Sequence, residues 1–549
     1  MNLKSKLRKV EDMLEEKKLG KILSLLLLAI FFFLTIYYVK ENLYYMLDSD
    51  QSSELILGRL LAKEGGILSK NWYYSTELRV LNTNLFYAFF FRFTDNWRHV
   101  RLLSYICMYI ILLLTYFFME KALGIKKYIC LFAIILMLPF SVDYYVYVLQ
   151  GGYYLPHLSI AFLTIALLAV FARKSGGAKY GIAFFSFVLA FLSGLGGPRQ
   201  VFVLYFPLFL AAAGIYWFLK LKEEVYRNFL LIASCDFLGS ILGYAINSKI
   251  LSKIYCFKDY EINFTGFSFS ELETMINGLL YDFGYSCESL FSFALIRNLL
   301  TAAWVLLTLY SIYYALKNVN KVSAEYVLLA VFTMAAYFVF ILLYLFTDME
   351  YRSRYWVLLV IFSIPLILFL LNEWELKKYM AGRLALLFLA VSCICGLAFY
   401  KEYWKTDKNN EIMQICSIVL NKGYDAGYGT FWNSNILTEL SNGKLETYTW
   451  ATDEDETTDV DLKTLYQTKT VDTIDEWLQL KEHKEKKPEG KVFLIFTTFQ
   501  VENNNWKNNL KDEDLIYSSE NYRVYGYESF ETMTSILYEG VDISDGEEK

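Results

Sequence analysis

The sequence of 549 residues has little of several residues and motifs that point to common protein classes. Only six prolines occur, so no proline-rich linker is present. The eight cysteines include no Cys-x-x-Cys pair, the spacing typical of zinc and thiol-redox sites. The net charge of −5 argues against a nucleic-acid partner, which would require a basic face. No internal repeat of the kind that builds propellers or solenoids is present.

Apolar residues are abundant. Hydrophobic residues make up 56% of the chain and aromatic residues 18%, whereas charged residues make up only 20%. Long apolar stretches recur from Lys21 to about Tyr400 and then stop. A soluble domain rarely carries so much apolar side chain, because its core cannot hide it all. We therefore predict a polytopic α-helical membrane protein with a cytoplasmic N-terminal tail at 1–20, a transmembrane domain at 21–400 with an outer loop at 40–100, and a small extracytoplasmic α/β domain at 401–549.

A membrane-spanning helix needs about 20 apolar residues. About eleven segments are candidates by this measure, and the one near 128–142 is short. They are 21–39, 101–118, 128–142, 157–172, 180–196, 201–219, 228–247, 293–316, 325–346, 355–371 and 383–399. No small-residue cleavage site follows the first segment, which predicts a retained transmembrane helix and not a signal peptide.

The positions of basic residues predict the orientation. Lysine and arginine are concentrated in the N-terminal tail and in every second connection, namely at 121–127, 173–179, 220–227, 317–321 and 377–383. The intervening connection at 143–156 has neither. Because cytoplasmic loops are enriched in basic residues, the N-terminus is expected in the cytoplasm of a multi-pass protein of the cell membrane. An odd number of helices then places the C-terminal domain outside.

The segment after the first helix carries candidate catalytic carboxylates. Its sequence, ENLYYMLDSDQSSELILGRLLAKEGG, predicts an amphipathic helix that lies in the outer interface and ends at Gly65-Gly66. In one interpretation Asp50 or Ser49 is merely the N-cap of this helix. In the other, Asp48 or Asp50 is a general base that takes the proton of an attacking hydroxyl. Both hold if one aspartate caps and the other acts.

Further polar residues are predicted at the same outer level. They are Glu77 and Arg79 in the long loop, Tyr153 and His157 before the fourth helix, Arg199 before the sixth, and Arg352 and Arg354 before the tenth. The guanidinium fork suits a phosphate at headgroup depth, although arginine also anchors helices at the interface. Arg199, Arg352 and Arg354 are therefore the candidate phosphate-binding residues. Of Arg352 and Arg354, we expect one to bind the phosphate and the other to anchor the helix, and the sequence does not distinguish them. The other four residues are candidate substrate contacts.

The arrangement resembles the GT-C superfamily of membrane glycosyltransferases, which includes the protein O-mannosyltransferases and aminoarabinose transferases. The resemblance rests on LDSDQSSEL, with Asp48 and Asp50 early in a long outer loop, and on RSRYW, from Arg352 to Trp356, before a late helix. The His-Pro-Pro stretch of several mannosyltransferase-like members is absent after Asn71. The resemblance implies a polyprenyl-phosphate-linked sugar as donor and a glycan, lipid or protein as acceptor. Some members need a divalent metal and others do not, so the metal requirement is left open.

Two other functions remain possible on the sequence alone: a non-enzymatic envelope or interaction protein, and a transporter of lipid-linked sugars. The outer level of the charged groups disfavours a transporter, which would carry ionisable residues near the bilayer midplane. A disulfide between Cys256 and Cys287, which lie in one predicted outer loop, is also left open. The C-terminal pattern predicts helices at 411–420, 433–440 and 473–484, and strands at 445–450, 492–498 and 522–527.

Overall fold

The structure is a computed structural model. It describes residues 18–537 and residue 539, except for 77, 79, 258–262, 268–269, 288–292, 350, 374–377, 406, 454–466, 469–473 and 503–506. Glu77 and Arg79, two of the predicted substrate contacts, lie outside the described residues.

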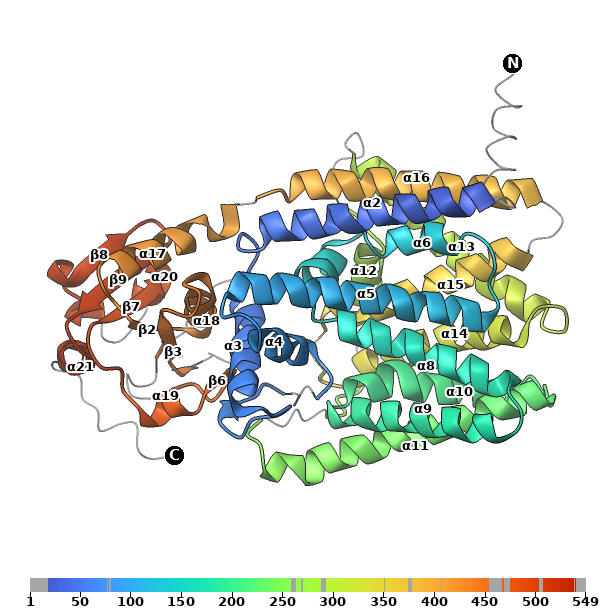
Figure 1. Cartoon of the computed structure of the whole chain (residues 1–549), viewed down its shortest axis with the longest axis horizontal. Helices are drawn as coiled ribbons and strands as arrows, with labels where there is room; N and C mark the ends of the chain where they lie inside the picture. Colours follow the sequence, from blue (N-terminus) through green and yellow to red (C-terminus); the bar gives the residue numbers. More distant parts are fainter. Residues whose placement is uncertain are drawn as a thin grey trace, which may run out of the picture.

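Long apolar helices form most of the molecule. In the part of the chain that the structure describes, nine are long and apolar enough to cross a membrane, which identifies a multi-pass membrane protein by helix length and hydropathy. They are α2 (Lys18–Asn42), α5 (Trp97–Leu123), α8 (Leu155–Arg173), α9 (Gly177–Leu195), α11 (Glu224–Lys249), α13 (Ala294–Lys317), α14 (Ala324–Phe346), α15 (Val357–Glu373) and α16 (Lys378–Glu402). Figure 1 shows them side by side, with the C-terminal region at one end of the bundle. We call this the domain end and the opposite one the basic end.

The basic end gathers connections that are far apart in the sequence. Arg173, at the end of α8, forms an ion pair of 2.6 Å with Glu325 at the start of α14 and donates to the backbone carbonyl of Ala122. The Lys179 ammonium donates to Asn228 of α11 over 2.8 Å. The basic connections predicted from the sequence therefore meet at one end of the helices, opposite the C-terminal region.

Two of the eleven predicted spans do not form long helices. The segment near 128–142 contains only α6 (Ile129–Ile135), a turn and the start of α7 (Val142–Tyr144). The Lys127 amide donates to Asn372 in the last turn of α15, and Asp143 accepts from Ser353 just before α15. This broken segment therefore runs along α15 from its last turn to its start. The segment near 201–219 forms a π-helical turn and α10 (Phe206–Trp217), an apolar helix shorter than the nine spans.

Helices α9 and α11 pack closely through glycine. A Cβ atom on Gly194 would lie 2.0 Å from the backbone oxygen of Ser240, and one on Gly243 would lie 2.1 Å from that of Phe191. Small residues let membrane helices approach until their backbones touch, which replaces the hydrophobic driving force that lipid does not supply. The pair presents apolar side chains such as Phe184 and Leu238 on its exposed face.

Two shorter helices, α3 (Ser49–Glu64) and α4 (Thr83–Phe91), lie at the domain end. Helix α3 runs across the bundle end at a steep angle to the long helices (Figure 1). It ends as predicted, because Gly65 adopts a left-handed conformation and its amide donates to the Leu61 carbonyl over 2.9 Å. The amphipathic pattern predicted a helix resting on the interface. Instead most of its first three turns are buried, because α4 and the C-terminal region cover it.

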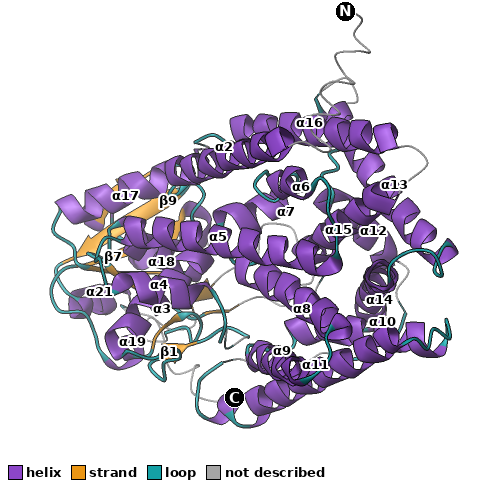
Figure 2. Cartoon of the chain, turned by 45° about the vertical axis from the view of Figure 1, so that its right-hand side comes forward, coloured by secondary structure: helices purple, strands orange, loops and turns teal. Residues whose placement is uncertain are grey.

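The C-terminal region is a small mixed α/β unit, and Figure 2 shows its strands together at one end of the molecule. Its sheet has the order β3 (Glu446–Thr449), β2 (Ala426–Gly429), β7 (Val492–Thr497), β9 (Tyr522–Tyr527) and β8 (Leu515–Ser518). Strands β3, β2 and β7 are parallel to one another. Strand β9 is antiparallel to β7, and β8 is antiparallel to β9. The remaining helices are α17 (Asn410–Asn421), α18 (Phe431–Leu440), α19 (Glu482–Glu485), α20 (Thr498–Glu502) and α21 (Phe530–Leu537).

Most of the predicted elements of this region are confirmed, but the helix at 473–484 is wrong. Its described residues form a short strand, β6 (Gln479–Leu480), followed by the single turn of α19. Strand β6 pairs with β1 (Trp72–Tyr73) of the long loop. The possible disulfide is also absent, because Cys256 and Cys287 are both free and exposed.

A buried ion pair joins the two regions. Arg101 in the first turns of α5 makes two bonds to the carboxylate of Glu439 in α18, Nε–Oε1 at 2.6 Å and Nη2–Oε2 at 2.5 Å. The same guanidinium donates to Tyr105 and to the backbone oxygen of Gln51 in α3, both over 2.9 Å. Arg101 and Glu439 are both fully buried. The C-terminal region is therefore tied to the long helices and to the first turn of α3 by one charged network.

Candidate functional site

The two candidate aspartates occupy different positions at the start of α3. Asp48 has an extended backbone, and its Oδ1 accepts the Gln51 amide over 2.7 Å, so Asp48 is the N-cap. The prediction that Asp50 or Ser49 caps the helix is wrong. Burial, followed by the negative charge of Asp50, raises the pKa of Asp48 to about 6. Asp50 lies two residues further on, within the first turn of α3.

Asp50 lines a cavity of 60 Å³ at the domain end. The cavity gathers side chains from separate parts of the chain: Asp50, Asn82, Tyr147, Tyr153, Tyr154, His157, Arg199 and Arg354. One carboxylate, two guanidinium groups, an imidazole and three phenol rings therefore converge on one space. The sequence predicted that a carboxylate of the first loop and arginines of distant helix ends share a pocket, and the structure brings Asp50, Arg199 and Arg354 together.

The two arginines of this cavity lie against aromatic rings. The Arg199 guanidinium carbon is 5.5 Å from the ring centroids of Tyr154 and Tyr355. That of Arg354 is 4.9 Å from the ring centroid of Tyr147. Cation–π contacts of this kind hold a guanidinium in place. The pair therefore forms a cationic wall of the cavity that Asp50 also lines.

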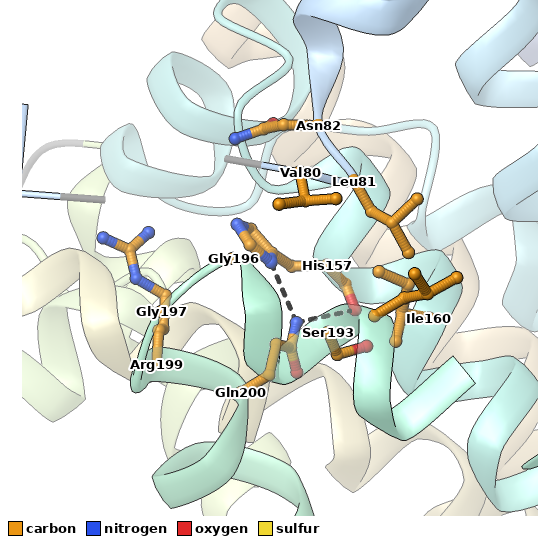
Figure 3. Close-up of a pocket in the computed structure, with 11 residues that line it drawn as sticks. Val80, Leu81, Asn82, His157, Ile160, Ser193, Gly196, Gly197, Arg199 and Gln200 are labelled. Carbon is orange, nitrogen blue, oxygen red and sulfur yellow. Dashed lines mark hydrogen bonds between the residues drawn. The ribbon is translucent and has the colours of Figure 1, made fainter. Parts of the chain in front are cut away.

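Helix α8 supplies His157 to the cavity, and the turn before this helix supplies Tyr153. The Tyr153 hydroxyl is 3.4 Å from Asp48 Oδ1, so Tyr153 connects the capping carboxylate with the cavity. The Gln200 amide nitrogen is 2.9 Å from His157 Nδ1 and donates to it, so the neutral imidazole carries its proton on Nε2. Figure 3 shows His157 and Gln200 in a neighbouring pocket, whose lining also includes Asn82 and Arg199. The two pockets adjoin, because Asn82, His157 and Arg199 line both of them.

The remaining predicted arginine lies elsewhere. Arg352 is exposed and does not line the cavity. It precedes a short 3₁₀ turn (Ser353–Trp356), in which successive residues point in different directions. Within the same connection, Asp348 accepts from the backbone and side chain of Asn263 over 2.7 and 3.0 Å, an exposed structural contact.

An apolar groove begins at the edge of the polar cavity. The groove has a volume of 460 Å³ and lies between α4, α5 and α8, where Phe86, Ile111 and Leu163 line it. Asn82 lines both the groove and the polar cavity. Along α5 the groove reaches from Cys107 to Thr115, a rise of about 12 Å toward the middle of the bundle. The polar cavity and the apolar groove therefore adjoin at Asn82.

Sequence analysis missed several residues of the site. Asn82, Tyr147 and Gln200 lie in or next to segments that look apolar, and no charge marks them. Tyr147 belongs to a π-helical turn (Tyr145–Gln150), and Gln200 precedes a second one (Val201–Tyr205). Such turns are frequent at functional sites, but the sequence gives no pattern for them.

A second missed feature is a pair of carboxyl groups beside Arg354. Asp143 accepts from the Ser353 hydroxyl over 2.5 Å and lies next to Asp282, the last residue of α12 (Ser270–Asp282). Burial raises the pKa of Asp143. Burial and then the negative charge of Asp143 raise the pKa of Asp282 well above its ordinary value, so the pair favours holding a proton. Among the described residues no three carboxylate, histidine or cysteine side chains form a metal site.

The fold and the site together define a multi-pass helical membrane protein with a small α/β region over a polar cavity. Compared with models of known protein families and with curated proteins, the sequence gives no match.

Proposed function

We propose that this protein is a membrane glycosyltransferase that uses a polyprenyl-phosphate-linked sugar as donor and a glycan, lipid or protein of the cell envelope as acceptor. The observation that carries the proposal is the convergence of Asp50, Arg199 and Arg354 on one cavity that adjoins an apolar groove at Asn82. A lipid-linked sugar phosphate needs both spaces, a polar one for its head and an apolar one for its chain. The resemblance of LDSDQSSEL and RSRYW to the GT-C superfamily points the same way.

The basic connections support an orientation for this site. They meet at the end of the bundle opposite the cavity. Because basic loops stay in the cytoplasm, the cavity and the C-terminal region are proposed to lie at the outer face. This orientation suits donors and acceptors on the outer leaflet.

The proposed reaction assigns one role to each group. The Asp50 carboxylate takes the proton of the acceptor hydroxyl as its oxygen attacks the anomeric carbon. The bond between that carbon and the phosphate oxygen breaks, and the lipid phosphate leaves with the bonding electrons. Arg199 and Arg354 stabilise the negative charge that develops on this phosphate. Asp48 keeps the first turn of α3 in place, and the tyrosines are positioned to contact the sugar.

The test replaces Asp50 by asparagine, which keeps the shape of the side chain and removes the base. Envelope glycans are compared by mass spectrometry between a strain that lacks the protein and the same strain carrying the original protein or a variant. Asp50→Asn is expected to lower transfer by about 10²- to 10⁴-fold, the usual contribution of a placed general base. Asp348→Asn is the matched control, because Asp348 lies at the same end but outside the cavity.

Variant amounts in the membrane are compared by immunoblot, so that loss of protein is not read as loss of activity. Full glycan transfer by Asp50→Asn would show that Asp50 is not the base. An unchanged glycan profile in the strain that lacks the protein would contradict the glycosyltransferase proposal itself.

A further inference from the structure

A second cavity, of 240 Å³, lies where the C-terminal region meets α3 and the start of α5. It is on the side of α3 away from Asp50, because Asp50 and Arg59 are nine residues apart and so point in opposite directions. Helix α3 contributes Arg59 and Lys63, and the C-terminal region contributes Glu446, Gln479 and His483. The two cavities share no lining residue, so this one is a separate site.

The wall formed by α3 is cationic. Arg59 and Lys63 are one helical turn apart and both line the cavity. The Arg59 guanidinium carbon is 5.3 Å from the ring centroid of Trp97, a buried residue that supports it from behind. Within the described residues neither Arg59 nor Lys63 has a carboxylate within ion-pair distance. Two cationic groups thus face the cavity without a counterion bonded to them.

The opposite wall adds the imidazole ring of His483. The amide of Gln479 is fixed by Thr449, since its Oε1 accepts the Thr449 N–H over 3.2 Å and its Nε2 donates to the Thr449 carbonyl over 3.1 Å. His483 Nδ1, at 3.1 Å from that Oε1, therefore donates to it. His483 Nε2 is 3.2 Å from Glu446 Oε1, which is also an acceptor. Both ring nitrogens of His483 therefore face acceptors, which hold the ring in place at this wall.

The charges of the cavity do not cancel. The two acidic lining residues are Glu446, which is bonded to His483, and Glu482. Glu482 is bonded to Lys486 over 2.9 Å, and this exposed pair is neutral by itself. Arg59 and Lys63 thus face one further carboxylate, that of Glu446, and a net positive charge remains in a partly enclosed space.

We propose that this cavity binds an anionic saccharide, that is, a sugar unit carrying a carboxylate or a phosphate group. The charge of the cavity selects an anion, and bidentate arginine is suited to both groups. Its volume exceeds what a lone anion fills, and Thr438 and Asn435 line the rest with a hydroxyl and an amide group that suit sugar hydroxyls. The site does not depend on the proposed function, because it is built entirely on the other side of α3.

The test measures binding to the full chain in lipid nanodiscs by isothermal titration calorimetry. The probes are glucuronate, glucose 6-phosphate, glucose and inorganic phosphate. An acidic sugar is expected to bind the original protein, and glucose and inorganic phosphate are each expected to bind more weakly. Arg59→Gln and Lys63→Gln should each weaken binding of the acidic sugar by roughly 10- to 100-fold, the effect of losing a charged hydrogen bond. Lys444→Gln is the matched control, because Lys444 is a neighbouring exposed lysine that does not line the cavity.

Each contrary outcome has a distinct meaning. Equal binding of inorganic phosphate and glucose 6-phosphate would reduce the cavity to an anion site and overturn its saccharide specificity. No binding of either acidic sugar, or unchanged binding by Arg59→Gln and Lys63→Gln, would overturn the proposal. The melting temperature of each variant is measured alongside, as a control for folding. Glycan transfer that depends on Asp50 is measured separately, and it is expected to be unchanged whether or not this second cavity binds a saccharide.

Discussion

Glu439→Gln is expected to destabilise the attachment of the C-terminal region to the long helices. In the native protein the Arg101 guanidinium makes two bonds to the Glu439 carboxylate, at 2.5 and 2.6 Å, and both residues are fully buried. Glutamine keeps the size of the side chain, but it removes the counter-charge and turns an N–H group toward the guanidinium. Arg101 would then be a buried cation without a counterion.

The magnitude follows from the burial. Removing one partner of a buried ion pair costs about 3–5 kcal/mol, because the charge that remains can be neither hydrated nor neutralised. The bonds from Arg101 to Tyr105 and to the Gln51 carbonyl are neutral and do not replace the lost charge. We therefore expect a decrease of about 3–5 kcal/mol in the free energy of unfolding of the C-terminal region.

Urea unfolding of the purified protein in detergent micelles, followed by tryptophan fluorescence, measures this change. Limited proteolysis tests whether the C-terminal region detaches. The matched control is Glu528→Gln, which removes an acid from an exposed pair with Lys491 at 2.8 Å and should have a far smaller effect. The double variant Arg101→Met/Glu439→Leu should be more stable than Glu439→Gln alone, since neither charge is then buried. If Glu439→Gln lowers stability no more than the exposed control does, the reasoning from the buried charge is wrong.

Three further predictions concern Asp48, the glycine contacts and the apolar groove. Because the pKa of Asp48 is raised from its ordinary value to about 6, the folded protein holds this proton more tightly than the unfolded chain, and stability falls by about 3 kcal/mol as the pH rises from about 4 to about 6. Asp48→Asn removes this pH-dependent loss of stability and still caps the helix. The melting temperature of the variant should therefore exceed that of the original protein at pH 7.5 and not at pH 4. A difference in melting temperature that is equal at both pH values would contradict the raised pKa of Asp48. Gly194→Ala should lower the melting temperature in detergent, because the added Cβ would overlap the backbone of Ser240 and overpacking costs about 1–3 kcal/mol. Gly214→Ala in α10 is the control. An added Cβ meets no atom within 4 Å there, so this variant should be neutral or slightly more stable. Ser159→Trp fills the groove and should raise the KM for a lipid-linked donor while leaving the fold intact, as judged by the melting temperature; an unchanged KM would show that the groove does not hold the lipid chain.

The sequence by itself determined the membrane class and most of the helices, because hydropathy is a local property and a spanning helix satisfies its backbone hydrogen bonds within itself. It also located Asp50, Arg199 and Arg354, since polar residues at helix ends on one side must lie at a similar depth. It did not distinguish Arg352 from Arg354, because the 3₁₀ turn that follows Arg352 and contains Arg354 has no signal in the sequence.

Tertiary structure decided the rest. Asp48, Ser49 and Asp50 all carry side chains that can cap a helix, and only the extended backbone before α3 selects Asp48. The pattern at 473–484 favours a helix, but pairing of Gln479–Leu480 with Trp72–Tyr73 makes a strand there. The bond between Arg101 and Glu439 joins residues 338 positions apart. Such contacts depend on how distant segments pack, and no local pattern of charge or hydropathy encodes them.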